Sequence, residues 1–294
     1  MLKKNKLGFF EVADKPSISE LSEYYQNKYY QEAKGSYELK YSDSELEYFN
    51  AKLSRIHFLI NQYQNPESEH SLLDIGCGEG FGLQYFATQG FSVTGLDFSN
   101  AGICMHNPDF EGHVEVGDLF DLISNKIDSS LKYDVVLLQN VLEHVLEPLQ
   151  LLSIIKRLLK PHGLVVITVP NDFSITQHAL LRNGCITREF WVCPPDHLSY
   201  FNFESLKNVL LASDFHIHDL IADFPVDWYL FNSTSNYILN PSKGKEAHLA
   251  RVVIENMLQD NDIKDVVSFY RSLAVLGAGR DLTAVVSINE NCLS

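Results

Sequence analysis

The chain has 294 residues, of which 45% are hydrophobic, and its formal net charge at pH 7 is −15. That length and composition suffice to bury the core of one large domain, or of a domain with a cap. The negative charge argues against a nucleic-acid partner, because binding to a polyanion depends on Lys and Arg neutralising phosphates. The five cysteines form no C-x-x-C pair, which indicates neither a disulfide framework nor a zinc knuckle, so we expect a reducing, cytoplasmic location.

The amino terminus predicts neither a signal peptide nor a membrane anchor. Glu11, Asp14 and Lys15 interrupt any apolar stretch that would be long enough for a signal peptide. No run reaches the roughly 18 apolar residues of a membrane span. We therefore expect no secretion and no stable membrane insertion.

The amino-terminal part of the chain predicts a helical cap or lid over residues 1–65. Residues 16–64 are rich in Tyr, Glu, Lys and Leu at helical spacing. Their tyrosines, Tyr30 among them, are candidates to close over a bound cofactor, and a packing stripe between helices is the alternative. Residues 65–70 break the helical pattern, so we expect the second domain over residues 66–294.

From residue 71 onward, short apolar runs alternate with helical stretches. We expect strands at about residues 71–75, 91–96, 113–116, 134–139, 164–169, 215–223 and 281–288. Such alternation is typical of an α/β fold whose parallel sheet is covered by helices on both faces. No crossover helix is evident before the last strand.

Two insertions interrupt this alternation, at about residues 171–200 and 224–275. Both look irregular, and both follow the carboxyl end of an expected strand. Because ligands of open α/β sheets lie outside the carboxyl ends of the strands, we expect these insertions to form the walls of an acceptor pocket.

The run from Leu72 to Gly82 is an apolar strand that ends in an acid and opens into a glycine-rich loop before a helix. Glycines at such a junction let a ligand approach the backbone, and the helix that follows presents unpaired N–H groups. The next strand ends in Asp97, where an acid can bind a ribose diol. These features predict a nucleotide-binding site.

The glycine spacing argues against a dinucleotide. Dinucleotide-binding folds use G-x-G-x-x-G, and Phe81 stands where the third glycine would be. A carboxylate at Asp74 would repel a pyrophosphate, but it suits a ligand that carries a cation. S-adenosylmethionine carries both a sulfonium and an ammonium group. An NAD-dependent oxidoreductase remains the weaker alternative.

On these residues, Asp74 to Gly80, the sequence resembles the class I S-adenosylmethionine-dependent methyltransferases. The resemblance covers about residues 68–220 and 280–290. It implies a seven-stranded Rossmann-like sheet with helices on both faces, in which the last strand enters antiparallel between the fifth and sixth strands. The expected fold is therefore this sheet with a helical amino-terminal cap and insertions.

The resemblance also implies which residues bind the cofactor. Those around the methionine portion would be Asp74, Gly76, Cys77, Gly78 and Gly80. Asp97 would accept hydrogen bonds from the ribose hydroxyls, with Phe98 beside the adenine. A helix cap for the residues from Ser99 onward is the alternative role of Asp97.

Two further pairs complete the implied cofactor site, together with Tyr30 as a lid residue. Asp118 and Leu119 would recognise the adenine, Asp118 by accepting from its exocyclic amine. Gln139 and Asn140, at the tip of the fourth strand, would bind the amino-acid end.

The segment from Asn140 to His144 is similar to the fourth motif of the ubiquinone-pathway-like methyltransferases, the type 11/23 group. A hydroxyl acceptor needs a place for its proton, and histidine titrates near neutral pH. We expect His144 or His197 to be this general base. The alternative for each is a structural histidine that orients its loop.

We expect no required metal. Some ubiquinone-pathway relatives have an acid three residues before the Glu-His pair, and here that position is Asn140. A hard cation needs several oxygen ligands, and one carboxylate with one imidazole does not provide them. Glu143 then has an alternative as an acid at a helix amino terminus.

The sequence thus predicts a methyltransferase that uses S-adenosylmethionine to methylate a hydroxyl on a small molecule. A nucleotide-linked or carrier-linked sugar is a candidate acceptor, because Lys243, Lys245, His248, Arg251 and Arg280 could meet a phosphate or carboxylate. C- or N-methylation of a small metabolite is the main alternative. A cofactor-binding protein without turnover is a weaker one. Acceptor identity and oligomeric state are left open.

Overall fold

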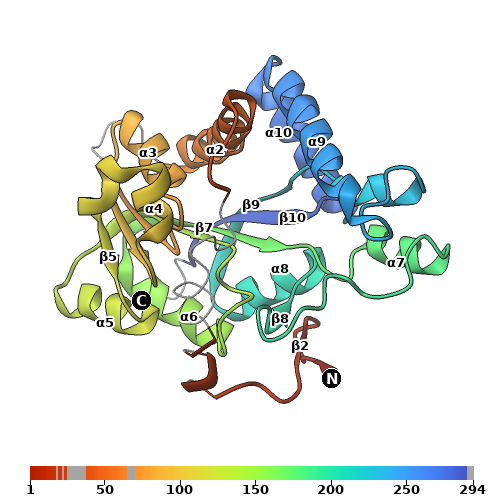
Figure 1. Cartoon of the computed structure of the whole chain (residues 1–294). Helices are drawn as coiled ribbons and strands as arrows, with labels where there is room; N and C mark the ends of the chain where they lie inside the picture. The colour runs from red at the N-terminus through yellow and green to blue at the C-terminus, as the bar shows by residue number, and fades with distance from the viewer. Residues whose placement is uncertain (18, 22, 25–37, 65–69, 290–294) are drawn as a thin grey trace.

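A seven-stranded sheet forms the centre of the molecule (Figure 1). The computed structural model describes residues 1–294 except 18, 22, 25–37, 65–69 and 290–294. The strands in spatial order are β5 (Val114–Val116), β4 (Ser92–Asp97), β3 (Ser71–Ile75), β6 (Tyr133–Gln139), β7 (Leu159–Pro170), β10 (Asp281–Ile288) and β9 (Phe215–Ala222). The expected seven strands are confirmed.

The directions of the strands show which edge of the sheet collects their carboxyl ends. Strands β3 to β7 are parallel to one another, and β10 is antiparallel to both of its neighbours, β7 and β9. Six strands therefore end at one common edge, where β10 begins. The expected antiparallel entry of the last strand is confirmed.

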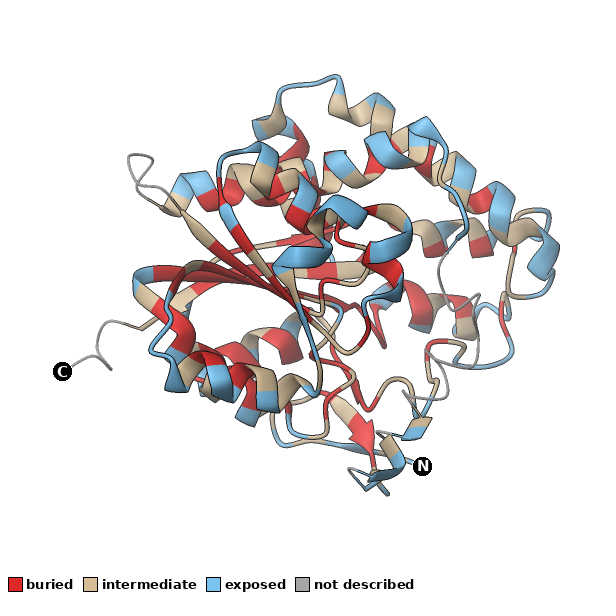
Figure 2. Cartoon of the chain, turned by 60° about the vertical axis from the view of Figure 1, so that its left-hand side comes forward, coloured by how far each residue is buried: buried red, intermediate tan, exposed pale blue. Residues whose placement is uncertain are grey.

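Helices cover both faces of the sheet (Figures 1 and 2). One layer contains α2 (Asp43–Tyr63), α3 (Phe81–Thr88), α4 (Ala101–His106), α9 (Gly244–Gln259) and α10 (Ile263–Val275). The other contains α5 (Leu119–Asp128), α6 (Pro148–Ile155) and α8 (Phe203–Ala212). Because both faces are covered, the central strands are apolar throughout, and residues 135–138 of β6 are fully buried. No helix among the described residues has the length and apolar content to cross a bilayer.

The first twelve residues form strands instead of the expected helical cap. Strand β1 (Leu2–Lys4) pairs with β2 (Phe10–Val12), which pairs with β8 (Ser199–Tyr200). The buried side chains of Phe9 and Val12 anchor this segment. Sequence pattern missed it because two three-residue strands carry almost no periodicity, and because the pairing partner lies some 190 residues away.

The insertion at 224–275 is largely helical, which corrects the expectation of an irregular segment. After the 3₁₀ turns η3 (Val226–Phe231) and η4 (Pro241–Lys243), helices α9 and α10 lead directly into β10. The crossover helix that seemed absent is therefore α10. Its buried residues Val266, Val267, Tyr270, Leu273 and Ala274 recur at helical spacing. The insertion at 171–200 contains α7 (Ile175–Arg182) and β8.

Candidate active site

The loop between β3 and α3 turns at two glycines. Gly76 and Gly78 have φ angles of +75° and +53°, a left-handed conformation that favours glycine. A Cβ on Gly76 would lie 2.5 Å from Cγ2 of Val141. Val141, in the loop after β6, therefore lies so close to the backbone of Gly76 that any residue with a Cβ at position 76 would collide with it.

Gly80 and Cys77 pack this loop against the domain. A Cβ on Gly80 would lie 2.8 Å from Cδ1 of Ile103. The Cys77 sulfur lies 2.8 Å from the position that a Cβ on Gly95 would take, and burial raises the pKa of the Cys77 thiol. Neither residue lines the cavity described below; both pack this loop against the fold, and their contact with a cofactor stays a prediction.

Asp74 lies at the penultimate position of β3 and is 2% exposed. Its Oδ1 has no hydrogen-bond partner among the described residues. Burial, followed by the nearby charge of Asp97, raises the pKa of Asp74 to about 7. An unsatisfied buried carboxyl costs about 1–3 kcal/mol, and a cation beside it would offset this cost.

Asp97 ends β4 and holds two loops together. Its Oδ2 accepts the main-chain N–H of Gly78 at 2.7 Å, and its Oδ1 accepts that of Ser99 at 3.0 Å. Asp97 therefore fixes the turn before α4 but does not cap that helix, whose N-cap is Asn100, and each oxygen still has a lone pair for a ribose hydroxyl. Burial raises the pKa of Asp97, while these N–H groups lower it.

Asp118 and Leu119 lie at the amino terminus of α5. The Asp118 side chain caps the helix by accepting from the N–H groups of Phe120 and Asp121, at 2.9 and 3.2 Å. Both predicted residues line the cavity, as does Phe98.

Asn140 follows β6 in a left-handed conformation, with φ +53°. Its N–H donates to the main-chain oxygen of Thr168 at 2.9 Å, which fixes the turn. Asn is one of the few side chains that accept this conformation at low cost. Gln139 lies behind this turn and does not line the cavity, whereas Asn140 does.

These elements surround one cavity of about 720 Å³, a volume typical of small-ligand sites. Of the predicted site residues, the cavity is lined by Gly76, Gly78, Asp97, Phe98, Asp118, Leu119, Asn140 and His144. Sequence reasoning missed Leu21, Phe120, Asp121, Val141, Val145, Leu146, Glu147 and Gln150. Most of these residues lie next to predicted motifs in the sequence, but the sequence did not show that their side chains point into the cavity. Tyr30 lies outside the described residues.

His144 lies at the wall of this cavity, and its ring is fixed by the insertion at 171–200. Its Nδ1 is 2.7 Å from the main-chain oxygen of Asp196. A carbonyl oxygen can only accept, so Nδ1 carries the proton and Nε2 is the basic nitrogen. Nε2 lies 3.8 Å from Oε1 of Glu143. His197 packs edge-on against His144, with ring centroids 4.9 Å apart, and does not line the cavity.

The family model Methyltransf_23, described as a methyltransferase domain, matches residues 44–220. That match covers the glycine loop, Asp97 and the segment that contains His144. The chain belongs to the class I S-adenosylmethionine-dependent methyltransferases. The dinucleotide alternative is thereby set aside.

Curated relatives of the methyltransferase include ubiquinone biosynthesis O-methyltransferases. The protein from Rickettsia conorii is 33% identical over 190 residues, covering 63% of this chain and 60% of that protein. The protein from Rickettsia akari is 29% identical over 177 residues, covering 56% and 68%. This chain spans about half to two-thirds of the length of the curated relatives that it matches.

Solved structures similar to the methyltransferase share little sequence with it. A SAM-dependent methyltransferase from Archaeoglobus fulgidus has a TM-score of 0.48 and 18% identity, covering 90% of this chain and 97% of that chain. The plantazolicin methyltransferase BpumL has a TM-score of 0.49 and 19% identity, covering 94% and 91%.

A group of possible metal ligands lies beside the cavity of the methyltransferase. Ligand atoms of Glu143, His144 and His197 lie within 4.8 Å of one another, as do those of Cys193, Asp196 and His197. Sequence reasoning counted one imidazole and did not foresee that the second, His197, would lie beside it. Burial raises the pKa of Glu143 well above its usual range, which opposes ligation because a metal needs the ionised form. That no metal is required stays a prediction.

The amino-terminal region reaches the glycine loop through a residue that sequence reasoning missed. The hydroxyl of Tyr41 donates to Oε1 of Glu79 at 2.8 Å, and His106 Nε2 lies 3.3 Å from the same oxygen. The sequence did not indicate this contact, because Tyr41 and Glu79 are 38 positions apart.

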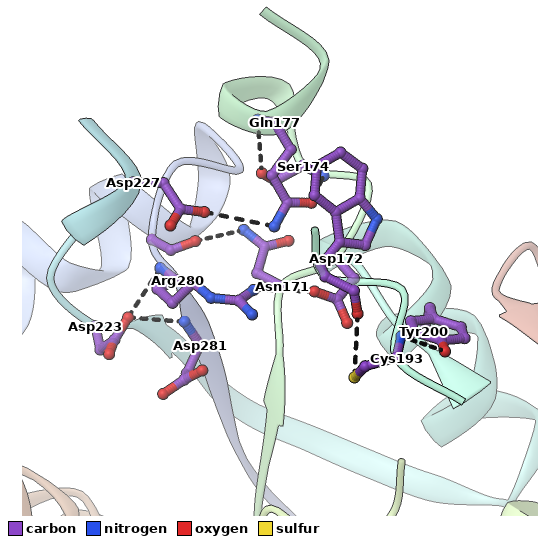
Figure 3. Close-up of polar contacts among 12 residues, drawn as sticks. Asn171, Asp172, Ser174, Gln177, Cys193, Tyr200, Asp223, Asp227, Arg280 and Asp281 are labelled. Carbon is purple, nitrogen blue, oxygen red and sulfur yellow. Dashed lines mark hydrogen bonds and ion pairs between the residues drawn. The ribbon is translucent and has the colours of Figure 1, made fainter. Parts of the chain in front are cut away.

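That the two insertions form the walls of an acceptor pocket stays a prediction. No described residue of 171–200 or 224–275 lines the cavity. The first insertion instead fixes His144 through Asp196, and the second packs on α2. The two insertions meet where Gln177 Nε2 donates to Oδ2 of Asp227, and Asp172 of the first insertion lies in a cluster of charged side chains at the start of β10 (Figure 3).

Proposed function

We propose that this methyltransferase transfers the methyl group of S-adenosylmethionine to a hydroxyl of a small molecule, with His144 as the general base. One observation carries the proposal: His144 lines the cavity, and its Nδ1–H donates to the main-chain oxygen of Asp196, so that Nε2 is the basic nitrogen of the ring. His197 is the less suitable of the two predicted histidines, because it lies behind His144.

The cofactor, when bound, supplies an activated methyl group on a sulfonium. In the proposed step the acceptor oxygen forms the new C–O bond as the C–S bond breaks, and the electron pair stays on sulfur. His144 Nε2 takes the hydroxyl proton and becomes positively charged. Glu143 Oε1 lies 3.8 Å from this nitrogen, and because burial raises the pKa of Glu143 well above its usual range, we assign it no charge in the step. A base of this kind contributes about 10²–10⁴-fold to the rate.

The described contacts support a place for each part of the cofactor. We assign the nucleoside to the part of the cavity lined by Asp97, Phe98, Asp118 and Leu119, and the amino-acid end to the part lined by Asn140 and His144. The unsatisfied carboxyl of Asp74 lies next to the glycine loop and suits a ligand with positive charge. A cytoplasmic location, expected from the cysteines, belongs to the same proposal.

The test is an assay of S-adenosylhomocysteine release against panels of phenols, neutral sugars and amines, followed by NMR of the product. The proposal expects a methyl group on oxygen. It also expects turnover to increase with pH through the neutral range, because the base must be unprotonated. A product methylated on nitrogen or carbon, at a rate indifferent to His144→Ala, would contradict it.

A further inference from the structure

Five charged side chains meet where β10 begins, and we call them the Arg280 cluster: Lys52, Asp172, Asp223, Arg280 and Asp281. The guanidinium of Arg280 donates from Nη1 to Oδ1 of Asp172 at 2.9 Å (Figure 3). Oδ1 of Asp223 accepts the main-chain N–H groups of Arg280 and Asp281, at 2.9 and 2.7 Å. Lys52 of α2 places Nζ 3.8 Å from Oδ2 of both Asp223 and Asp281.

The Arg280 cluster lies at the same edge of the sheet as the loop that carries His144. Asp172 follows β7 by two residues, and β7 is the neighbour of β6, whose loop carries His144. Glu143, next to His144 in the chain, feels the charges of Asp281 and Asp172, which add to the effect of burial in raising its pKa. A small acceptor whose hydroxyl reaches His144 would therefore extend toward this cluster.

Several oxygens of the cluster and its surroundings lack donors. Among the described residues, no hydrogen bond reaches Oδ1 of Asn171, Oδ2 of Asp172 or Oδ2 of Asp223, and these residues are 1%, 1% and 6% exposed. A purely structural cluster would satisfy such atoms, since each costs about 1–3 kcal/mol when left unpaired. The unpaired oxygens indicate that a ligand supplies donors.

Access to the cluster is through its less buried members. The side chains of Arg280 and Asp281 are each 21% exposed, and that of Lys52 is 32% exposed. Arg280 uses only Nη1 in its contact with Asp172, so its other N–H groups can donate to a ligand. The open part of the cluster thus offers donors and acceptors side by side.

We infer that the Arg280 cluster is a subsite for a neutral acceptor bearing several hydroxyl groups, the chemistry of a sugar ring. A hydroxyl both donates and accepts, so it satisfies carboxylates and Arg280 N–H groups together. An anionic acceptor would meet the carboxylates of Asp172, Asp223 and Asp281, and an amine would meet Arg280 and Lys52. This inference rests on the proposed function and assigns its acceptor class. Arg280 and Lys52 are the specificity residues, and Asp172 positions Arg280.

The experiment is saturation-transfer NMR on the full chain with saturating S-adenosylhomocysteine. The probes are methyl glycosides of neutral hexoses and 6-deoxyhexoses, with catechol and benzylamine as comparison ligands. We expect signals from a glycoside, and affinity about tenfold weaker in Arg280→Met, as for the loss of one hydrogen bond to a charged group. Binding of S-adenosylhomocysteine should stay within twofold of the original protein.

Lys52→Met gives an independent test if Arg280→Met fails to fold, because Lys52 is the most exposed member of the cluster. Lys207→Met is the matched control, since Lys207 lies on α8 and pairs only with Glu204 and the Phe203 ring. Binding of catechol or benzylamine alone, no glycoside binding, or glycoside binding unchanged by Arg280→Met and Lys52→Met would overturn the inference. Failure to bind S-adenosylhomocysteine would overturn the proposed function, and this inference with it.

Discussion

Oδ2 of Asp74 lies 2.6 Å from the position that a Cβ on Gly82 would occupy, so the carboxyl packs against the bare backbone of α3. The other oxygen, Oδ1, has no hydrogen-bond partner among the described residues. The end of β3 and the first turn of α3 therefore pack closely on both sides of the Asp74 carboxyl, which has little contact with solvent. This arrangement makes the protonation of Asp74 sensitive to a bound cation.

Cofactor binding should depend on pH through Asp74. Its pKa is raised to about 7 in the free protein, and a bound sulfonium or ammonium favours the ionised form. Affinity for S-adenosylmethionine should therefore fall as pH drops below about 7, with proton release on binding. Calorimetry between pH 5.5 and 8.5 in buffers of different ionisation enthalpy measures both. Affinity and proton release that do not change with pH would contradict the assignment.

Asp74→Asn should weaken cofactor binding and stabilise the free protein above pH 7. The folded state keeps the Asp74 proton up to about pH 7, whereas an unfolded chain loses it near pH 4. The folded state binds more protons in this window, so the contribution of Asp74 to the free energy of unfolding falls as pH rises. Thermal unfolding of Asp74→Asn should show a flatter pH dependence, with exposed Asp128→Asn as control.

Gly76→Ala should reduce S-adenosylhomocysteine affinity at least about tenfold. A left-handed backbone costs alanine about 1–2 kcal/mol, and the new Cβ would meet Val141. Gly112→Ala is the matched control, because a Cβ there meets nothing within 4 Å. Adding Val141→Ala should recover part of the lost affinity. Normal binding by Gly76→Ala would show that the loop is not held as described.

His144→Ala should lower kcat about 10²–10⁴-fold while S-adenosylhomocysteine affinity stays within twofold. The measurement uses the acceptor that the panel assay identifies. His197→Ala should cost less, because His197 supports the His144 ring and does not line the cavity. His216→Ala, on the exposed side of β9, is the control. Full turnover by His144→Ala in a folded protein would refute the general-base role.

Metal removal should leave turnover unchanged. Burial raises the pKa of Glu143 well above its usual range, which disfavours the ionised form that a metal needs, and His144 Nδ1 already donates to Asp196, so the Glu143, His144 and His197 group lacks a ready donor set. Dialysis against EDTA, with elemental analysis before and after, measures this. Stoichiometric zinc or nickel that disappears in Glu143→Gln, together with lost turnover, would show a metal site.

Much of the sheet could be predicted because its signals are local. The alternation of apolar strands with helices identifies all seven strands. The glycine loop and Asp97 follow neighbouring parallel strands, so the sequence also predicts that they lie at the same edge of the sheet. The packing roles of Gly80 and Cys77 were not predictable, because they depend on Ile103 and Gly95 across the fold.

Contacts between distant segments account for the other differences. The pairing of Phe10 with Tyr200 turns the amino terminus into a strand, although its own residues show no period. The bond from His144 to Asp196 joins residues 52 positions apart. No short-range pattern records either contact, so the choice between His144 and His197 required the structure.

The most direct test of the cofactor site compares S-adenosylhomocysteine and NAD by calorimetry in the original protein and in Asp97→Ala. We predict one molecule of S-adenosylhomocysteine bound per chain, no heat with NAD, and affinity at least about tenfold weaker in the variant, which loses the ribose acceptor and the contact to Gly78. Binding of NAD in place of S-adenosylhomocysteine, or unchanged affinity in Asp97→Ala, would contradict the site described here.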